Sequence, residues 1–228
     1  MIILITNDDG IDADGLKALK KAASGLGEIF TVAPAGAMSQ VGHRVTTEKP
    51  IPVEEIDERA WAVDGTPADC VRVAIKKLLP KKPDWVLSGI NHGGNMGHDI
   101  YISGTIAAVR EAAFHGLQGI ALSHYLRNGV PLDWEVSGRR VTTILEKLLG
   151  DDLDPGEHWN VNLPHIHDHE PEPEVHHTEP DPAPLPVDFE DSAEGLTYRG
   201  VYAERLRAPG SDVAVCFGGQ ISVSKLKI

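Results

Sequence analysis

The sequence predicts an α/β fold with one mostly parallel β-sheet. Over residues 1–125, short apolar runs typical of strands alternate with segments whose apolar residues recur at helical spacing. Strands that alternate with helices form βαβ units, and such units build parallel sheets. The chain has 228 residues, which is enough for one substantial core and marginal for two, so we expect a single domain over residues 1–228.

The first elements each begin or end at a recognisable signal. Residues 2–6 form an apolar, β-branched run that is typical of a buried strand. Asp12 can cap the helix that follows, and this helix is expected to close near Gly25. Residues 29–33 form a second apolar strand, which Pro34 ends.

The middle of the chain repeats this alternation. Residues 61–63 form a short apolar strand. Thr66 and Pro67 are a strong helix start, because Thr can cap and Pro suits the first helical position. Residues 85–87 form the next strand, and residues 105–115 form a helix of mostly small side chains.

The remaining elements extend the pattern toward the C-terminus. A strand is expected over residues 120–122, a helix over about residues 134–149 and a strand over residues 159–163. The tail is expected to add two short strands, over residues 213–215 and 220–223.

Residues 165–195 differ in composition from the rest of the chain. They are rich in Pro, His and acidic residues, which favours an extended arm or a hairpin at an edge of the sheet. The core is therefore expected over about residues 1–164 and 196–228. The histidines of the arm are His165, His167, His169, His176 and His177. They could bind zinc or nickel, but their spacing fixes no tetrahedral site, so a solvated arm is the favoured interpretation.

Charge and composition exclude several classes of protein. The net charge of −13 comes from residues 151–194, which hold 14 acidic residues and no Lys or Arg. Because a nucleic-acid binder would show a basic face, no stable nucleic-acid partner is expected. No apolar run is long enough for a membrane span, and because Met1 leads directly into the first strand, no signal peptide is expected. Cys70 and Cys216 lack motif spacing, which favours buried thiols in a reducing cytoplasm.

Asp8 and Asp9 form the most informative pair in the sequence. They follow the first strand directly, and ligands of open α/β sheets bind at the carboxyl ends of strands. Adjacent carboxylates repel each other and require a counter-charge, which a divalent hard cation supplies. The alternative is an Asp-Gly turn, with Asp12 capping the next helix.

Three further loops follow strand ends and carry oxygen-donor side chains. The loops are residues 33–39, 88–97 and 99–105, and the donors are Ser39, Asn91, Asn95, Ser103 and Thr105. Oxygen ligands suit Mg²⁺, Mn²⁺ or Ca²⁺. Turn and capping chemistry explains each donor taken singly, but four polar loops at one edge of the sheet favour a common site.

The same loops offer a place for an anion. Three residues at the start of a predicted helix form a natural phosphate site, namely Ser103, Gly104 and Thr105. His43 and Arg44 lie just after Ser39 and are candidate contacts to a phosphate or a leaving group. The alternative for these two residues is an exposed polar turn.

Five motifs stand in order along the chain: NDDGI at 7–11, AP…S at 33–39, VDGTPADCV at 63–71, SGIN-x-G-x-N-x-G at 88–97 and SGTIAAVRE at 103–111. In this order and spacing they resemble the SurE (survival protein E) family of metal-dependent phosphatases. The resemblance is continuous over about residues 1–125 and resumes weakly at 160–164 and 211–223. The chain departs from the family pattern directly after Ser39 and before Ser103, which affects the expected phosphate and base contacts but not the ion site.

The resemblance implies a 5′/3′-nucleotidase with a Rossmann-like core, helices on both faces of the sheet and a C-terminal arm exchanged between protomers. It implies one divalent ion per subunit, Mg²⁺, Mn²⁺ or similar, held by Asp8, Asp9, Ser39 and Asn91. It places Asn95, Ser103, Gly104 and Thr105 on the phosphate-binding stretch of the family. It also favours a homodimer or homotetramer.

The expected function is that of a cytoplasmic phosphomonoesterase acting on nucleoside 5′- or 3′-monophosphates. The ion is expected to polarise a phosphoryl oxygen and activate a water that Asp8 or Asp9 orients or deprotonates. A phosphorylated Asp8 is the mechanistic alternative. The alternative activity is a broad-specificity acid phosphatase or exopolyphosphatase. A non-catalytic nucleotide-binding regulatory module is a further alternative, but it would not need all four oxygen ligands.

Overall fold

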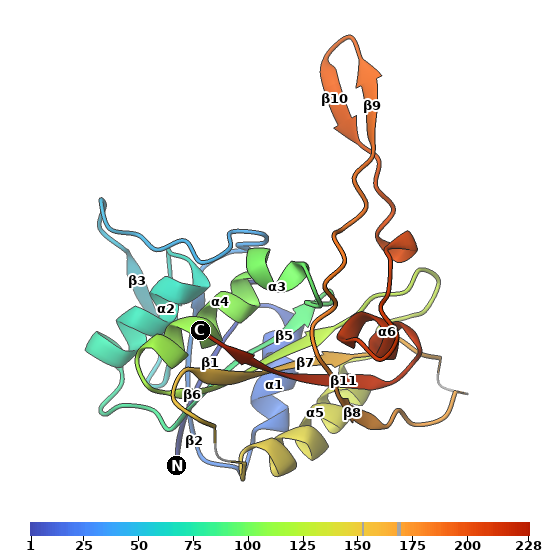
Figure 1. Cartoon of the computed structure of the whole chain (residues 1–228). Helices are drawn as coiled ribbons and strands as arrows, with labels where there is room; N and C mark the ends of the chain where they lie inside the picture. The colour runs from blue at the N-terminus through green and yellow to red at the C-terminus, as the bar shows by residue number, and fades with distance from the viewer. Residues whose placement is uncertain (152, 168–169) are drawn as a thin grey trace.

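The alternating strands and helices fold into three layers, with helices on both faces of a nine-stranded sheet (Figure 1). This computed structural model describes residues 1–151, 153–167 and 170–228. Its elements are β1 (Ile2–Thr6), α1 (Asp14–Ala22), β2 (Glu28–Pro34), β3 (Val53–Asp57), β4 (Ala60–Val63), α2 (Pro67–Val73), the π-helical turn η1 (Ala74–Leu78), β5 (Trp85–His92), α3 (Asp99–Ile102), α4 (Gly104–Phe114), β6 (Gln118–His124), α5 (Trp134–Leu148), β7 (Glu157–Leu163), β8 (Val175–His177), β9 (Phe189–Ser192), β10 (Gly195–Tyr198), the 3₁₀ turn η2 (Tyr202–Glu204), α6 (Asp212–Phe217) and β11 (Ile221–Lys227). Among the described helices, none has the length and apolar character needed to cross a membrane.

The strand order is that of a doubly wound sheet, in which the chain adds strands first on one side of β1 and then on the other. The order is β3-β4-β2-β1-β5-β6-β7-β11-β8. The pairs β4–β2, β2–β1, β1–β5, β5–β6 and β6–β7 are parallel, whereas β3–β4 and β7–β11 are antiparallel. The mostly parallel sheet is therefore confirmed. The chain winds from β1 to β2 on one side and returns to β5 on the other, so the crevice for a ligand lies at the carboxyl end of β1.

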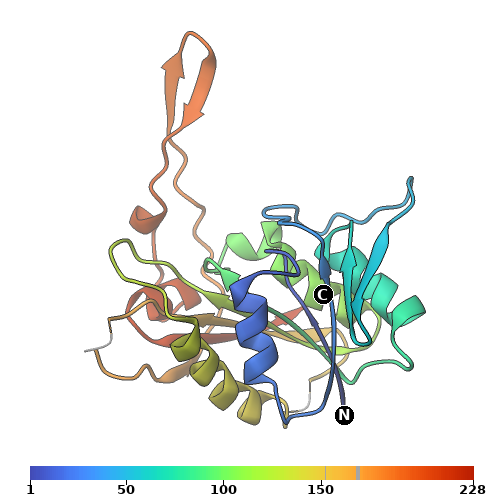
Figure 2. The ribbon, with the colours of Figure 1, turned by 180° about the vertical axis from the view of Figure 1, so that it is seen from behind.

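Two apolar layers hold the helices against the sheet. Side chains alternate along a strand, so Ile3 and Ile5 of β1 face α1 and α5, and Ile2 and Leu4 face α2 and α4. Figure 2 shows α1 and α5 in front of the sheet when the molecule is seen from behind. The expected Rossmann-like arrangement, with helices on both faces, is confirmed.

The helix starts are partly as predicted. Thr66 caps α2 through a capping box, because its hydroxyl accepts from the backbone of Asp69 and the Asp69 carboxylate accepts from the backbone of Thr66. The prediction for α1 is wrong at both ends. A turn in which Ala13 N donates to Gly10 O precedes the helix, so the N-cap is Ala13, which makes no side-chain hydrogen bond. The helix ends at Ala22.

The tail contains a helix where a strand was expected. Residues 213–215 lie in α6, whose N-cap Ser211 accepts from Ala214 N. A short apolar run fits a helix or a strand equally well, and the Ser-Asp start decides for a helix here. The second tail strand is present as β11, and it is longer than predicted because it pairs with β7 from Ser222 to Lys227.

The acidic arm has two parts. Its first part, β8, is the edge strand of the main sheet and pairs in parallel with β11. Its second part, β9 with β10, forms an antiparallel hairpin that projects away from the body of the molecule (Figures 1 and 2). An extended segment is thus present at the sheet edge, whereas the hairpin is a separate two-stranded sheet that continues to Tyr198, beyond the expected end of the arm.

Candidate active site

Polar side chains from several loops line one cavity of about 410 Å³ at the carboxyl ends of the central strands. The lining residues that the sequence predicts are Asp8, Asp9, Ser39, Asn91, Asn95 and Ser103. The fold therefore brings together the four expected metal ligands and two of the expected phosphate contacts.

Asp8 is a buried carboxylate held by a helix. It is 5% exposed, and its Oδ1 accepts a hydrogen bond of 2.6 Å from Thr105 Oγ1. Burial raises the pKa of Asp8 to about 6, the charge of Asp9 adds to the rise, and the hydrogen bond from Thr105 opposes it. No Lys or Arg is among the described residues that line the cavity. A bound cation would favour the charged carboxylate and reverse the rise in pKa.

Asp9 and Asn91 are held by neighbouring backbone. Asp9 Oδ2 accepts from His92 N at 3.1 Å, which ties the loop after β1 to the end of β5. Asn91 Nδ2 donates to Gly93 O at 2.8 Å. Because its amide nitrogen is engaged in this way, Asn91 keeps its carbonyl oxygen for a ligand in the cavity.

Ser39 reaches the cavity on the loop that follows β2. This loop is tied to the carboxylate pair because Met38 N donates to Asp8 O at 2.7 Å. The two loops approach so closely that a Cβ on Gly10 would lie 3.3 Å from the backbone of Gly36, and Gly10 has a φ of 107°. Gly10 therefore serves the close approach of the two loops that carry Asp9 and Ser39.

The start of α4 lies directly against Asp8. A Cβ on Gly104 would lie 2.9 Å from Asp8 Cβ, so a glycine is required at this position. Ser103 caps the helix, since its Oγ accepts from Ile106 N at 3.1 Å. Thr105 is fully buried and its hydroxyl donates to Asp8. The structure therefore makes Thr105 a support of the carboxylate, where the sequence predicted a phosphate contact.

Asn95 is held by two asparagines that the sequence analysis missed. Asn95 N donates to Asn162 Oδ1 at 2.7 Å, and Asn160 Nδ2 donates to Asn95 O at 2.8 Å. The Asn95 side chain donates to Ser123 Oγ at 2.7 Å. The signal was present in the sequence, because Asn160 and Asn162 alternate in an otherwise apolar strand and so point to the same face.

The root of the arm supplies another wall of the cavity. Leu185, Tyr198 and Tyr202 line it together with Asp99 of α3. Tyr202 OH donates to Asp99 Oδ2 at 2.6 Å, and Arg205 Nη1 donates to the same oxygen at 2.8 Å. No local sequence signal connects these residues, because more than 100 positions separate Asp99 from its two donors.

His43 and Arg44 are placed away from this cavity. His43 Nε2 lies 2.8 Å from Glu111 Oε2 of α4. Arg44 lines a different cavity, together with Thr66 and other residues that follow β2 and β4. The structure therefore does not bring these two residues together with the oxygen-donor set.

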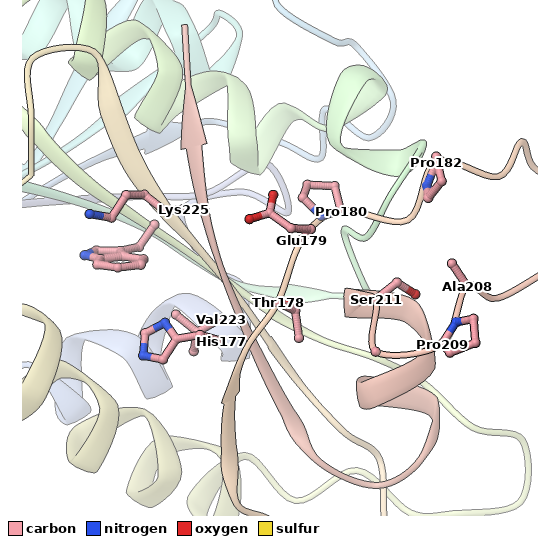
Figure 3. Close-up of a pocket in the computed structure, with 12 residues that line it drawn as sticks. His177, Thr178, Glu179, Pro180, Pro182, Ala208, Pro209, Ser211, Val223 and Lys225 are labelled. Atoms are coloured by element: carbon pink, nitrogen blue, oxygen red, sulfur yellow. The ribbon is translucent and has the colours of Figure 1, made fainter.

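The described arm histidines gather into no metal centre. Within residues 1–151, 153–167 and 170–228, no group of three or more His, Cys, Asp or Glu side chains is placed to hold a metal ion. His169 lies outside the described residues. His177 lines a separate cavity of about 520 Å³ beside β11, with Trp159 and Lys225 (Figure 3).

Fold and cavity together define a Rossmann-like α/β protein with a carboxylate pair and neutral oxygen donors at the topological switch point of its sheet. A family model described as Survival protein SurE matches residues 3–180. The chain belongs to the SurE family.

Relatives cover the full length of the chain. A putative 5′-nucleotidase of Nostoc sp. is 47% identical over 228 residues, which is 100% of both proteins. The 5′-nucleotidase SurE of Allorhizobium ampelinum is 37% identical and aligns over 100% of this chain and 92% of its own length. The crystal structure of the SurE protein from Aquifex aeolicus superimposes with a TM-score of 0.87 at 32% identity, covering 100% of this chain and 93% of that one. The resemblance inferred from the five motifs is confirmed.

Proposed function

We propose that this protein is a metal-dependent nucleotidase that hydrolyses nucleoside 5′-monophosphates, and also 3′-monophosphates, to nucleoside and phosphate. The reaction class follows from the family, whose relatives are named 5′-nucleotidases, which are phosphoric monoester hydrolases. The observation that carries the metal-dependent mechanism is that Asp8, Asp9, Ser39 and Asn91 line one cavity.

The donor set fits one divalent ion. Two carboxylates, a hydroxyl and an amide oxygen are hard ligands, which suit Mg²⁺ or Mn²⁺ better than a thiolate-preferring metal. The raised pKa of Asp8 supports this fit, because it reflects the burial of this carboxylate beside Asp9 without a neighbouring positive charge. When bound, the ion would neutralise charge on the phosphoryl group and lower the pKa of a water.

The residues of the chain hold the reacting groups in place. Thr105 fixes one oxygen of Asp8, and Asp9, which is the more exposed of the two carboxylates, is the better placed to accept a proton from the attacking water. Ser103 Oγ accepts from Ile106 N, so its hydroxyl hydrogen is left to donate to a phosphoryl oxygen. Asp8 as a direct nucleophile is the alternative, and labelled phosphate on the denatured protein after a quenched turnover would identify it.

We assign the nucleoside to the wall formed by the arm. Leu185, Tyr198 and Tyr202 offer apolar and aromatic surface there, whereas the loops after β1 and β5 offer oxygen atoms. Aromatic rings stack on any base, which fits an enzyme that accepts several nucleotides.

A substrate panel tests the proposal. Purified protein with Mn²⁺ or Mg²⁺ is expected to release phosphate from 5′-AMP and 3′-AMP, and EDTA is expected to stop the release. Asp9→Asn serves as the control for a contaminating phosphatase. Faster turnover of short polyphosphate or of a simple aryl phosphate would favour the broad-specificity alternative, and full activity in metal-free protein would contradict the proposed ion.

We also propose that the hairpin β9–β10 packs on a second protomer, giving a homodimer or homotetramer with exchanged arms. Apolar side chains of the hairpin face solvent in the single chain, with Leu196 66% and Phe189 52% exposed. Like-charged arms repel, so each hairpin is expected to lie on a neutral or basic surface of its neighbour.

We also propose a cytoplasmic location. The two free and buried cysteines, Cys70 and Cys216, support it, because thiols stay reduced in that compartment.

A further inference from the structure

The helix α4 contacts one proposed metal ligand directly and the loop that carries a second one at another place. Near its start, Thr105 holds Asp8. Two turns later, Glu111 holds His43, which lies at the end of the loop that carries Ser39. The two supports come from one rigid helix that packs beside α2.

Glu111 is a buried acceptor shared by two histidines. It is 8% exposed; its Oε2 lies 2.8 Å from His43 Nε2, and its Oε1 lies 3.1 Å from His115 Nε2. Burial alone would raise the pKa of Glu111, but the hydrogen bonds from the two histidines outweigh it, and the pKa lies below its usual range. The carboxylate is therefore held in its charged form, which strengthens each hydrogen bond that it accepts.

The Ser39 loop needs anchors on both sides. Gln40, next to Ser39, has a φ of 57°, the left-handed conformation that side chains other than glycine rarely adopt. Before it, Met38 N is bonded to Asp8 O, and after it, Gly42 N is bonded to Ile102 O at 3.0 Å. These bonds hold the backbone only.

The side chain of His43 completes this support. Its ring lies edge-on against Phe114 of α4 at a centroid distance of 5.8 Å, and its Nε2 contacts Glu111. Arg72 lies near the same carboxylate, 3.6 Å from Oε1, but comes from α2. Among these neighbours of Glu111, His43 is the one that belongs to the Ser39 loop.

We propose that Glu111 is a positioning residue that acts through His43 to hold Ser39 against the proposed metal ion. One helix thereby sets the distance between Ser39 and Asp8. This inference rests on the metal site of the proposed function, and it adds two residues that do not line the cavity. Mutation of residues that orient metal ligands without binding the metal themselves commonly lowers metal affinity about 10–100-fold.

The test compares two histidines that share one carboxylate. His43→Phe keeps an aromatic ring beside Phe114 and removes the contact with Glu111. His115→Phe is the matched control. It also removes a contact with Glu111, but His115 does not belong to the Ser39 loop. His43→Gln offers a replacement amide donor to Glu111.

Mn²⁺ affinity is measured by calorimetry without substrate, together with amide hydrogen exchange of residues 38–44. His43→Phe is expected to weaken Mn²⁺ binding about tenfold and to speed exchange in that loop. His43→Gln is expected to recover most of the affinity, and His115→Phe is expected to stay within about twofold of wild type.

Three results would overturn the inference and leave the proposed function intact. His43→Phe could bind Mn²⁺ as wild type does, or His115→Phe could lose as much affinity, which would make Glu111 a support of α4 alone. If His43→Phe does not fold, His43→Gln is compared with Glu111→Gln. Coupling through Glu111 would be excluded if His43→Gln lost tenfold in Mn²⁺ affinity at unchanged thermal stability and Glu111→Gln did not lose affinity. Wild-type protein that binds no Mn²⁺ would instead refute the metal site of the proposed function, and the inference with it.

Discussion

The cavity at the sheet edge and the hairpin β9–β10 are held together in opposite ways. At the cavity, residues distant in sequence hold one another, as Thr105 holds Asp8 and Asn162 holds Asn95. In the hairpin, the two strands pair with each other, and Tyr198 OH donates to Pro186 O only 12 positions away. The cavity is thus a product of the whole fold, whereas the hairpin is a local structure.

This difference separates two roles. An isolated two-stranded hairpin is at best marginally stable in water, so β9–β10 gains from any surface on which it packs. The cavity carboxylates have their supports within one chain. We therefore expect substitutions at the cavity to change metal binding and substitutions in the hairpin to change the oligomeric state.

The largest effect is expected at the carboxylate pair. Asp8→Asn or Asp9→Asn should lower metal-dependent turnover by about a thousandfold or more, because the loss of even one preorganised polar group costs 10²–10³ in rate. Circular dichroism should show a folded protein. Turnover near that of wild type at saturating Mn²⁺ would show that the core site does not depend on its carboxylates, and the comparison of the two regions would fail.

The next effect concerns the support of Asp8. Thr105→Val keeps the shape of the side chain and removes the hydroxyl that donates to Asp8. We expect Mn²⁺ affinity to fall about tenfold and kcat/KM to fall with it. Thr143→Val on α5 is the control, because it removes an exposed hydroxyl that is bonded within its own helix. A fall in kcat/KM at unchanged Mn²⁺ affinity would return Thr105 to the role of a phosphate contact.

A smaller effect follows from the pKa of Asp8. In metal-free protein this pKa is about 6, above the value of 3.8 that applies to an unperturbed Asp. The free energy of unfolding therefore decreases as pH rises from about 4 to above 6, because Asp8 ionises less readily in the folded protein than in the unfolded chain. Metal binding requires the charged carboxylate. Mn²⁺ affinity, measured by titration at several pH values, should therefore fall about tenfold per pH unit below pH 6 and level off above pH 7. Affinity that stays constant between pH 5 and 7 would contradict this assignment.

The smallest effect on the metal site is expected from removal of the hairpin. Arg199 N donates to Asp188 O at 2.8 Å, so residues 189–198 can be replaced by a short Gly-Ser linker without separating the ends. Light scattering should report a lower oligomeric mass, while Mn²⁺ affinity stays within about twofold. An unchanged mass would show that the hairpin is a solvated appendage, and a large loss of Mn²⁺ affinity would show that the two regions are coupled.

The sequence predicted the parts of the site whose signals are local. Asp8 and Asp9 stand directly after an apolar strand, and this pattern places them at the sheet edge before any tertiary contact is known. The hydroxyl of Thr105 could not be assigned in the same way, because its acceptor lies 97 positions away. His43 is close to Ser39 in sequence, but its side chain contacts Glu111 of α4, and this distant contact has no local signal.

The fold shows the same division. The alternation of strand and helix over the first 125 residues was predicted where burial and periodicity agree, whereas the exposed strand β3 and the short helix α3 were not predicted. Residues 213–215 are too few for periodicity to distinguish a strand from the helix α6. The composition of residues 165–195 indicated an extended arm or a hairpin, but it gave no bounds for β9 and β10, which are short and exposed on both faces.

The loop that carries Asn95 depends on the last part of the chain to be made. Asp212 accepts from Gly97 N at 2.8 Å, and Arg205 donates to Met96 O at 3.2 Å. During synthesis, Asp8 and Asp9 leave the ribosome among the first residues, but these two contacts can form only after Asp212 and Arg205, respectively, have emerged. The active site is therefore begun first and finished last, and a chain that stops before residue 205 would keep the carboxylate pair yet lack both ties.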